Sequence, residues 1–205
     1  MRTLLVFSAT VFVIAADFNA DGIQGILDVH NTLRATIAKG QYTAKTDKKP
    51  QAKNMRRIVW SNDLQASAQA YTNTCPSGHS GKAGVGENIF WSMTSGDLGD
   101  LNQYGLKAGQ AWQKEFQDHG WSTELLTMDL FNTGIGHATQ MAWANTSEVG
   151  CGVKHCPDPS WNKVTVVCQY KAQGNFLGQN IYDDGTTCSS CPSGTSCETS
   201  TGLCK

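Results

Sequence analysis

The sequence predicts an α+β domain that ends near residue 182, followed by a small disulfide-stapled tail. Three observations lead to this fold class. Segments with a helical spacing of apolar residues come early in the chain, and valine-rich segments typical of strands come late. Residues 183–205 contain four of the eight cysteines and only one large aliphatic side chain, Leu203. Disulfides rather than an apolar core must therefore order this tail.

Residues 1–16 have the features of a secretory signal peptide. Arg2 supplies a short positive region, residues 4–15 are mostly apolar, and Ala15-Ala16 offers the small residues typical of a cleavage site. The apolar run is too short to cross a membrane. All eight cysteines follow this segment, and their even number suits full pairing in an oxidising compartment. We expect a secreted, extracellular protein without a transmembrane segment.

Three helices are predicted in the first 120 residues. The first covers residues 23–38, with His30 on its apolar face, where we expect it to be buried or half-buried and to form hydrogen bonds with Asn31 and Arg34 nearby. A polar loop at 40–54 leads to the second helix, 63–74, capped by Asn62 or Asp63. The third covers 106–117, and its inward-facing residues are expected to be Ala108, Ala111, Trp112 and Phe116.

Three strands complete the domain. A short apolar run predicts a strand at 88–91, and two further strands are expected at 149–154 and 163–170. The segment Pro157-Asp158-Pro159-Ser160 is a strong turn signal between the last two. Helices early and strands late are typical of a layered α+β domain.

The charge balance argues against nucleic acid or an anionic membrane surface as a partner. The formal net charge is −1, from 16 basic and 17 acidic residues, whereas both of those partners require a basic excess. Residues 45–57 are locally basic and contain Pro50. We expect a solvated loop there, with a patch for an acidic partner as the alternative.

One motif places an imidazole among small residues ahead of an apolar anchor, Gly136-His137-Ala138-Thr139-Gln140-Met141-Ala142-Trp143. Two glycine-punctuated segments lie upstream, His79-Ser80-Gly81 and Gly86-Glu87-Asn88. Together these segments predict histidines and carboxylates gathered into one polar site.

These motifs resemble the CAP superfamily, which includes cysteine-rich secretory proteins, antigen 5 venom allergens and plant pathogenesis-related proteins. Further segments carry the resemblance: His30-Asn31-Thr32-Leu33-Arg34, Trp60 with Leu64 and Ala68, and Cys168-Gln169-Tyr170 with Gly174-Asn175-Phe176. The tail after Asn180-Ile181-Tyr182 is similar to that of the nematode activation-associated secreted or venom-allergen-like proteins. The resemblance implies one CAP domain over residues 17–182, a hinge-like tail over 183–205, and a three-layer α-β-α sandwich with a large central cleft.

The resemblance also implies that two histidines and two glutamates line this cleft, namely His79, Glu87, Glu115 and His137. Glu115 rests on its helix position after Trp112, and a shift would bring in Asp118 instead. Two residues depart from the family pattern. Ala138 replaces an aromatic residue, so we expect a more open cleft floor beside His137, and Thr165 replaces a larger apolar residue.

Three interpretations of the four cleft residues stay open. His79 and His137 can bind zinc or another divalent metal weakly, with water or the carboxylates completing the shell. A Glu–His pair can instead act as a base, with Ser80 or water as the nucleophile of a hydrolase, although no Gly-x-Ser-x-Gly or His-Glu-x-x-His motif occurs. Finally, the four side chains can satisfy one another as a structural polar network.

Eight cysteines allow too many pairings for the sequence to choose among them. The resemblance implies four disulfides, Cys75–Cys156, Cys151–Cys168, Cys188–Cys197 and Cys191–Cys204. A zinc cluster in the tail is the alternative that secretion disfavours. Separately, Asn145-Thr146-Ser147 is an N-glycosylation acceptor, which predicts a surface turn.

We expect a secreted, non-enzymatic protein that binds an extracellular protein or a lipid, host or immune factors included. A lipid or sterol version would use Phe90, Trp91 and Tyr104, a segment that only loosely resembles the family's sterol-binding loop. The first alternative is a secreted protease or esterase that uses the cleft. The second is a channel-blocking toxin, which in relatives depends on a further helical domain after the hinge, whereas this sequence stops at Lys205.

Overall fold

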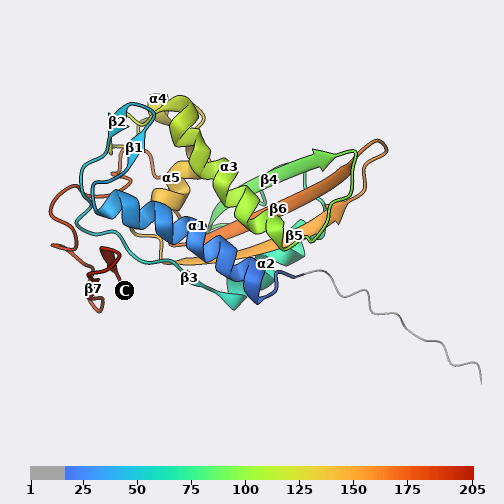
Figure 1. The fold of residues 1–205 in the computed structure, drawn as a ribbon, viewed down its shortest axis with the longest axis horizontal. Helices are drawn as coiled ribbons and strands as arrows, with labels where there is room; N and C mark the ends of the chain where they lie inside the picture. The colour runs from blue at the N-terminus through green and yellow to red at the C-terminus, as the bar shows by residue number, and fades with distance from the viewer. Residues whose placement is uncertain (1–16) are drawn as a thin grey trace, which may run out of the picture.

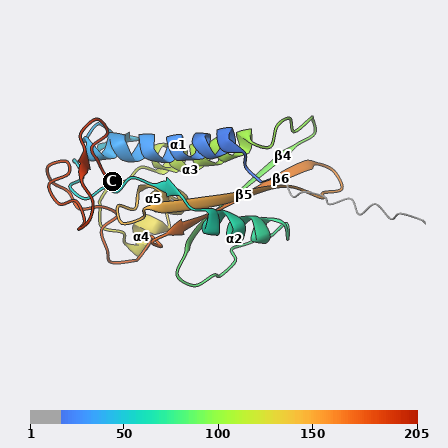
Figure 2. The same ribbon diagram turned by 90° about the horizontal axis from the view of Figure 1, so that it is seen from below.

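The computed structural model describes residues 17–205 as a four-stranded sheet between two helical layers (Figures 1 and 2). The predicted signal peptide, residues 1–16, lies outside the described part. One face of the sheet is covered by α1 (Ala20–Ala38) and α3 (Gln103–His119), and the other by α2 (Asn62–Thr72). The predicted three-layer α-β-α sandwich is confirmed.

The sheet has the order β3-β5-β6-β4. Its strands are β3 (Val59–Trp60), β4 (Gly86–Thr94), β5 (Glu148–Cys156) and β6 (Asn162–Lys171). All pairs are antiparallel except β3 with β5. The Asp158 carboxylate in the turn between β5 and β6 accepts hydrogen bonds from the amides of Ser160 and Trp161, which explains the turn signal. The predicted strands lie inside β4, β5 and β6, whereas β3 is too short for its pattern to be recognised.

Strand β6 is buried on both faces, because helices cover both sides of the sheet. Val164, Val166 and Tyr170 belong to the main core, on the side of α1 and α3. Val167 packs on the opposite side, against Ala68 of α2. This double burial accounts for the valine-rich sequence of the strand.

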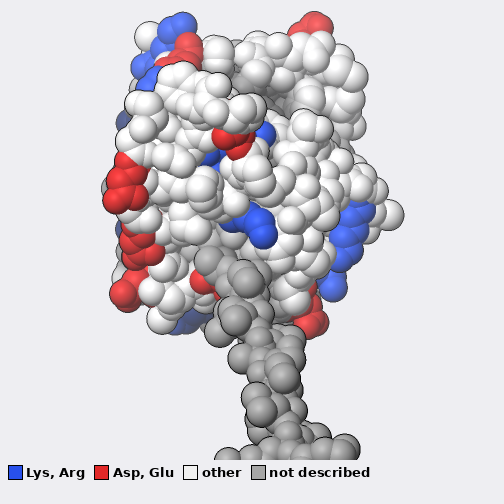
Figure 3. Space-filling model, turned by 90° about the vertical axis from the view of Figure 1, so that its right-hand side faces the viewer, with Lys and Arg blue, Asp and Glu red and all other residues white. Residues whose placement is uncertain are grey.

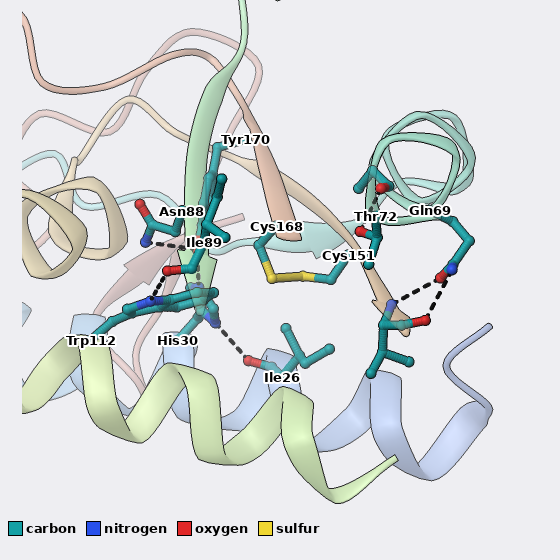
Figure 4. Close-up of a disulfide and its surroundings, with 12 residues drawn as sticks. Ile26, His30, Gln69, Thr72, Asn88, Ile89, Trp112, Cys151, Cys168 and Tyr170 are labelled. Atoms are coloured by element: carbon teal, nitrogen blue, oxygen red, sulfur yellow. Dashed lines mark hydrogen bonds between the residues drawn. A yellow bond between two sulfur atoms is a disulfide. The ribbon is translucent and has the colours of Figure 1, made fainter. Parts of the chain in front are cut away.

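A close approach of α2 to β5 requires glycine in the strand. A Cβ atom on Gly152 would lie 2.5 Å from Gln69 Cα, so no larger residue fits without a shift of the backbone. The Gln69 side chain then bonds directly to the strand: its Nε2 donates to the Val153 carbonyl and its Oε1 accepts from the Val153 amide (Figure 4). The predicted side-chain cap of α2 is wrong, because Ser61 is the N-cap residue and makes no side-chain cap bond.

Helix α3 presents a narrower apolar face to α1 than the sequence predicts. Its buried side chains include Tyr104, Ala108, Trp112 and Phe116, four residues apart, but Ala111 is exposed. The inward orientation predicted for Ala111 is therefore wrong. Glycine extends the face instead, because a Cβ atom on Gly109 would lie 2.4 Å from Val29 Cγ1 of α1.

Two buried polar residues of α1 tie the helix to the rest of the domain. His30 is fully buried; its Nδ1 donates to the Ile26 carbonyl and its Nε2 accepts from the Tyr170 hydroxyl (Figure 4). The burial agrees with the expectation, whereas the hydrogen-bond partners are Ile26 and Tyr170 rather than Asn31 and Arg34. Burial, together with the Arg34 charge, lowers the pKa of His30 to about 4, although the bond to Ile26 opposes the change.

Arg34 is fully buried and has no carboxylate partner within residues 17–205. Its guanidinium donates to five backbone carbonyls, those of Arg56, Met141, Trp143, Ala144 and Thr146. Burial and the nearby Arg56 charge lower the pKa of Arg34 to about 9. The guanidinium thus provides hydrogen-bond donors to the carbonyls of two separate chain segments, and the carbonyls of Trp143 and Ala144 also accept from backbone amides.

The remaining short elements lie at the end of the sandwich opposite the β5–β6 turn (Figure 1). They are β1 (Thr43–Ala44), β2 (Asp47–Lys48), α4 (Met128–Phe131), α5 (Gly136–Ala142), β7 (Cys197–Glu198) and β8 (Leu203–Cys204). On the face shown in Figure 3, the visible lysine and arginine side chains of the described residues form no continuous basic surface. No helix within residues 17–205 has the length and apolarity to cross a membrane.

The tail is joined to the domain by more than its disulfides. The Cys204 amide donates to the Met55 carbonyl, the Arg57 amide donates to the Cys204 carbonyl, and Leu203 is fully buried in the main core. The expectation that disulfides alone order the tail is therefore incomplete.

The structure contains the four disulfides that the resemblance implied, Cys75–Cys156, Cys151–Cys168, Cys188–Cys197 and Cys191–Cys204. The domain boundary at residue 182 stays a prediction.

Candidate functional site

Two adjoining hollows form a cleft at one end of the sheet, and they share Glu87 and Asn175. The larger one, about 380 Å³, is lined by His79, Ser80 and Lys82 among others. The smaller one, about 260 Å³, is lined by Glu115, Phe131 and His137 among others. The structure therefore brings all four residues of the predicted tetrad to one cleft.

Glu87, at the start of β4, accepts four hydrogen bonds. Its Oε1 accepts from His79 Nδ1 at 3.0 Å and from the Ser80 amide at 2.8 Å. Its Oε2 accepts from Ser80 Oγ at 2.6 Å and from Gln169 Nε2 at 3.0 Å. Burial raises the pKa of the Glu87 carboxyl, but the hydrogen bonds from Ser80, Gln169 and His79 together outweigh it and lower the pKa overall. Glu87 is therefore an ionised acceptor.

Glu115 accepts hydrogen bonds from His137 as Glu87 does from His79. Its Oε1 accepts from His137 Nδ1 at 2.6 Å, and its Oε2 accepts from the amides of His137 and Ala138 at 3.1 and 3.0 Å. These amides belong to the first turn of α5, where helix N–H groups lack partners within the helix. The Trp112 ring stacks on His137, with centroids 6.0 Å apart. Asp118, the alternative to Glu115, instead pairs with Lys114.

In both pairs the carboxylate occupies Nδ1 of the imidazole. A carboxylate of this kind only accepts, so Nδ1 carries the hydrogen and the lone pair of the neutral ring lies on Nε2. Neither Nε2 has a hydrogen-bond partner within residues 17–205. Metal-binding histidines are commonly oriented in this way by an outer carboxylate.

The cleft offers two imidazole nitrogens rather than a preassembled set of three ligands. Across residues 17–205, the one group of three or more histidine, cysteine or acidic side chains with ligand atoms within 4.8 Å of one another is Cys188, Cys191 and Cys204. All three of these cysteines are in disulfides, which removes the thiolates that a metal needs. The donor set of the cleft therefore fits a loosely held metal with water ligands.

Ser80 is not placed as the nucleophile of a Ser–His pair. Its hydroxyl donates to Glu87 and accepts from the Lys82 amide, while His79 Nδ1 bonds to the same Glu87 carboxylate. The lowered pKa of Glu87 also makes it a weak base. The geometry assigns Ser80 to holding the carboxylate.

Ala138 does not open the cleft floor as expected. Its side chain is fully buried in the main core and lines neither of the two hollows. Successive residues of a helix point in directions about 100° apart, so α5 turns His137 to the cleft and Ala138 to the core. Thr165, the other departure from the family pattern, is fully buried, and its hydroxyl has no partner among the described residues.

The three aromatics predicted to contact a lipid do not form one surface. Phe90 packs against the main core, whereas Trp91, the next residue of β4, is 40 % exposed. Tyr104 is buried within α3, and its hydroxyl donates to the Leu98 carbonyl. The prediction that Tyr104 lies in an accessible loop is wrong.

The glycosylation acceptor lies on the surface. Asn145 is exposed just after α5, while the neighbouring Thr146 is buried and its hydroxyl donates to the Ala172 carbonyl. This placement agrees with the predicted surface turn.

Two buried polar residues that support the cleft, Asn88 and Gln169, were not identified as site residues from the sequence. Asn88 Nδ2 donates to the Tyr170 hydroxyl at 3.2 Å (Figure 4) and also to the His137 carbonyl at 3.1 Å. Gln169 donates to Glu87. Asn88 belongs to the Gly-Glu-Asn motif and Gln169 to the Cys-Gln-Tyr motif. The sequence, however, does not show which side chains of these motifs point toward the cleft.

Comparison with known proteins agrees with this architecture. Residues 27–170 match the cysteine-rich secretory protein family, abbreviated CAP. The chain is 37 % identical over 186 residues to the Ancylostoma secreted protein of Ancylostoma caninum, which covers 87 % of the chain and 42 % of that protein. It is 35 % identical over 165 residues to venom allergen 5 of Vespula maculifrons, covering 78 % of each. The chain thus spans less than half of its hookworm relative.

Solved structures show the same fold. The chain is 34 % identical to NaASP2, whose crystal structure is described as containing Zn2+, with a TM-score of 0.82 over 93 % of this chain and 100 % of that one. It is 31 % identical to BmVAL-1, with a TM-score of 0.84 over 91 % and 94 % of the two chains. The profile match, the sequence identities and the shared fold all show that the chain belongs to the cysteine-rich secretory protein (CAP) family.

Proposed function

We propose that this chain is a secreted, non-enzymatic, venom-allergen-like protein whose cleft binds zinc or another divalent metal weakly through His79 and His137. One observation carries the proposal. Each histidine donates from Nδ1 to a glutamate, at 3.0 Å for His79 and 2.6 Å for His137, and so presents Nε2 as a ligand. The zinc in the NaASP2 structure, a relative at 34 % identity, supports the choice of metal.

The glutamates support the histidines in this proposal. Glu87 and Glu115 fix the orientation of the two rings and increase the basicity of Nε2. When bound, the metal would supply a positive charge able to attract an anionic group of a ligand. Two nitrogen ligands form a weaker site than three or four, which is why we propose exchangeable rather than permanent metal.

The relatives of this chain and its four disulfides support the proposal that it acts outside the cell. Relatives include venom allergens and a salivary antigen-5 of Dipetalogaster maximus, and four disulfides fit an oxidising compartment. We propose an extracellular protein or lipid as the partner, host factors included, and a glycan on Asn145. A protein partner is favoured over a sterol, because Phe90, Trp91 and Tyr104 do not share an exposed surface.

Calorimetric zinc titration tests the metal proposal. We expect His79→Ala and His137→Ala each to weaken zinc binding at least about tenfold, because each removes one of two nitrogen ligands. His155→Ala is the matched control, since His155 is an exposed histidine on β5 that does not line the cleft. Wild-type affinity in both cleft variants would place the metal elsewhere.

Hydrolysis is the competing function, and a screen of peptide and ester substrates addresses it. We expect no turnover, because Ser80 bonds to Glu87 rather than to a histidine. Activity that disappears in the His79→Ala/His137→Ala double variant would establish the hydrolase. Activity that persists in the double variant would be assigned to a contaminant.

A further inference from the structure

A chain of hydrogen bonds runs from the surface to Glu87 on the side of the sheet covered by α2. Lys82 Nζ donates to Ser67 Oγ, and Ser67 Oγ donates to Gln169 Oε1 at 2.7 Å. Gln169 Nε2 then donates to Glu87 Oε2 at 3.0 Å. Sheet register brings the last two together, because Glu87 of β4 lies directly opposite Gln169 of β6.

The direction of every bond in this chain is determined by its two ends. The Lys82 ammonium has only donors, so Ser67 must accept from it and direct its own hydrogen to Gln169. The Gln169 amide then has its oxygen toward Ser67 and its nitrogen toward Glu87. Glu87 is the acceptor at the other end. A flipped amide would place two oxygens against each other at Glu87, so only one orientation satisfies all the groups.

Gln169 is built into the domain rather than added to its surface. The Gln169 residue as a whole is 1 % exposed, and the Glu87 side chain is 7 % exposed. By contrast, the His79 side chain is 60 % exposed and, within residues 17–205, its ring is held by the single bond from Nδ1 to Glu87. The orientation of the exposed histidine therefore depends on a carboxylate that is itself held from inside the sheet.

We infer that Gln169 is a positioning residue, which holds Glu87 so that His79 carries its hydrogen on Nδ1 and presents Nε2 to the cleft. Ser67 and Lys82 act through it, by fixing the orientation of the Gln169 amide. The inference deepens the proposed metal site and rests on that proposal for the zinc readout alone, because the position of the ring hydrogen can be measured without metal.

The second histidine supplies a control within the same molecule. Glu115 is held by the His137 and Ala138 amides and makes no hydrogen bond to Gln169, Ser67 or Lys82 among the described residues. A change at Gln169 should therefore alter His79 and leave His137 as it is. A merely structural role of Gln169 would not select one histidine over the other.

The test combines Gln169→Met with nitrogen-15 NMR of the imidazoles in the metal-free protein, at about pH 8, above the range where free imidazole titrates. Methionine has a similar length and no amide. We expect the wild type to carry hydrogen on Nδ1 of both histidines. In Gln169→Met, His79 should become a mixture of the two tautomers while His137 keeps its own, and zinc affinity should fall about tenfold, as for other outer-shell changes.

Two further variants keep the test decisive. Thr165→Val is the matched control, since Thr165 lies four residues before Gln169 on β6 and its buried hydroxyl has no partner among the described residues; both histidines should match the wild type. Ser67→Ala, at a half-buried helix position, should shift His79 in the same direction as Gln169→Met and serves in its place if that variant does not fold.

An unchanged His79 tautomer in Gln169→Met, or in Ser67→Ala should the former not fold, would overturn the inference. So would an equal change at His137. A wild type that binds no zinc but shows the selective change at His79 would refute the proposed metal site and uphold Gln169 as a positioning residue.

Discussion

His30 is a neutral imidazole at the centre of the helical layer, and this makes the fold sensitive to acid. Its pKa is lowered from 6.5 to about 4, chiefly because burial penalises the charged ring. Arg34 lies one turn along the same helix and adds a positive charge nearby, whereas the two hydrogen-bond partners of the ring, the Ile26 carbonyl and the Tyr170 hydroxyl, carry no charge. The unfolded chain therefore binds a proton at higher pH than the folded chain does.

Stability should consequently fall as the pH drops from about 6.5 to about 4. The contribution of His30 is fully present above 6.5 and is lost as pH falls toward the folded pKa. The lowered pKa corresponds to about 3 kcal/mol. We expect His30→Gln to be less stable than the wild type at pH 7 but to lose about 3 kcal/mol less between pH 7 and pH 4. Urea unfolding at a series of pH values measures this, and parallel curves for the two proteins would contradict it.

Single residues also differ in how well the sequence predicts their surroundings. His79, Glu87, Glu115 and His137 were identified through the resemblance carried by short motifs, and the structure places them on one cleft. Arg34 lies in one of those motifs too, yet its five carbonyl partners include residues more than 100 positions away. Sequence does not reveal such partners, because backbone carbonyls have no residue-specific signal.

At the scale of elements, the sheet and α2 depend on contacts between backbones. Gly150 and Gly152 alternate with Cys151 on β5 and face α2, where a Cβ atom on either would lie within 2.5 Å of helix backbone. The helix can therefore rest directly on the strand, and Gln69 can reach Val153. Glycines at alternate strand positions can indicate such an approach, but the sequence does not name the helix that makes it.

Substitution of Gly152 by alanine should test this packing. We expect a loss of about 1–3 kcal/mol in the free energy of unfolding, because the added methyl group would lie 2.5 Å from Gln69 Cα and the helix must move. Gly78→Ala is the control, since a Cβ atom at Gly78 would have no atom of the described residues within 4 Å. Chemical denaturation of both variants provides the measurement. Equal stability of the two would show that α2 adjusts without cost.

At the scale of the whole molecule, the tail and the domain share one core. Leu203 is the single large aliphatic residue of the tail, and it is fully buried in the main cluster. Hydrogen bonds between Cys204 and the Met55–Arg57 segment complete the junction. Two disulfides within the tail and its packing against the domain therefore both hold the tail in place.

Leu203→Ala should destabilise the entire chain rather than the tail alone. We expect a loss of about 2–5 kcal/mol, the usual result of truncating a buried leucine, in a single cooperative transition. Thr199→Ala, an exposed position in the same tail, should be close to neutral. Thermal unfolding followed by tryptophan fluorescence reports on the domain, because the tail contains no tryptophan. A wild-type domain transition in Leu203→Ala would separate the tail from the core.

The sequence by itself determined the layered α+β class, through periodic apolar spacing, and the resemblance to the family, through short motifs that keep their residue order. The three-layer sandwich and the four residues expected in the cleft came from what that resemblance implies. The tertiary structure alone decided which nitrogen of each histidine faces the cleft, that Ala138 belongs to the core, that Tyr104 is inaccessible, and that Gln169 supports Glu87. Those properties depend on partners brought together by strand register and helix packing. Each hydrogen bond direction is set by groups far apart in the chain, and only the folded arrangement specifies them.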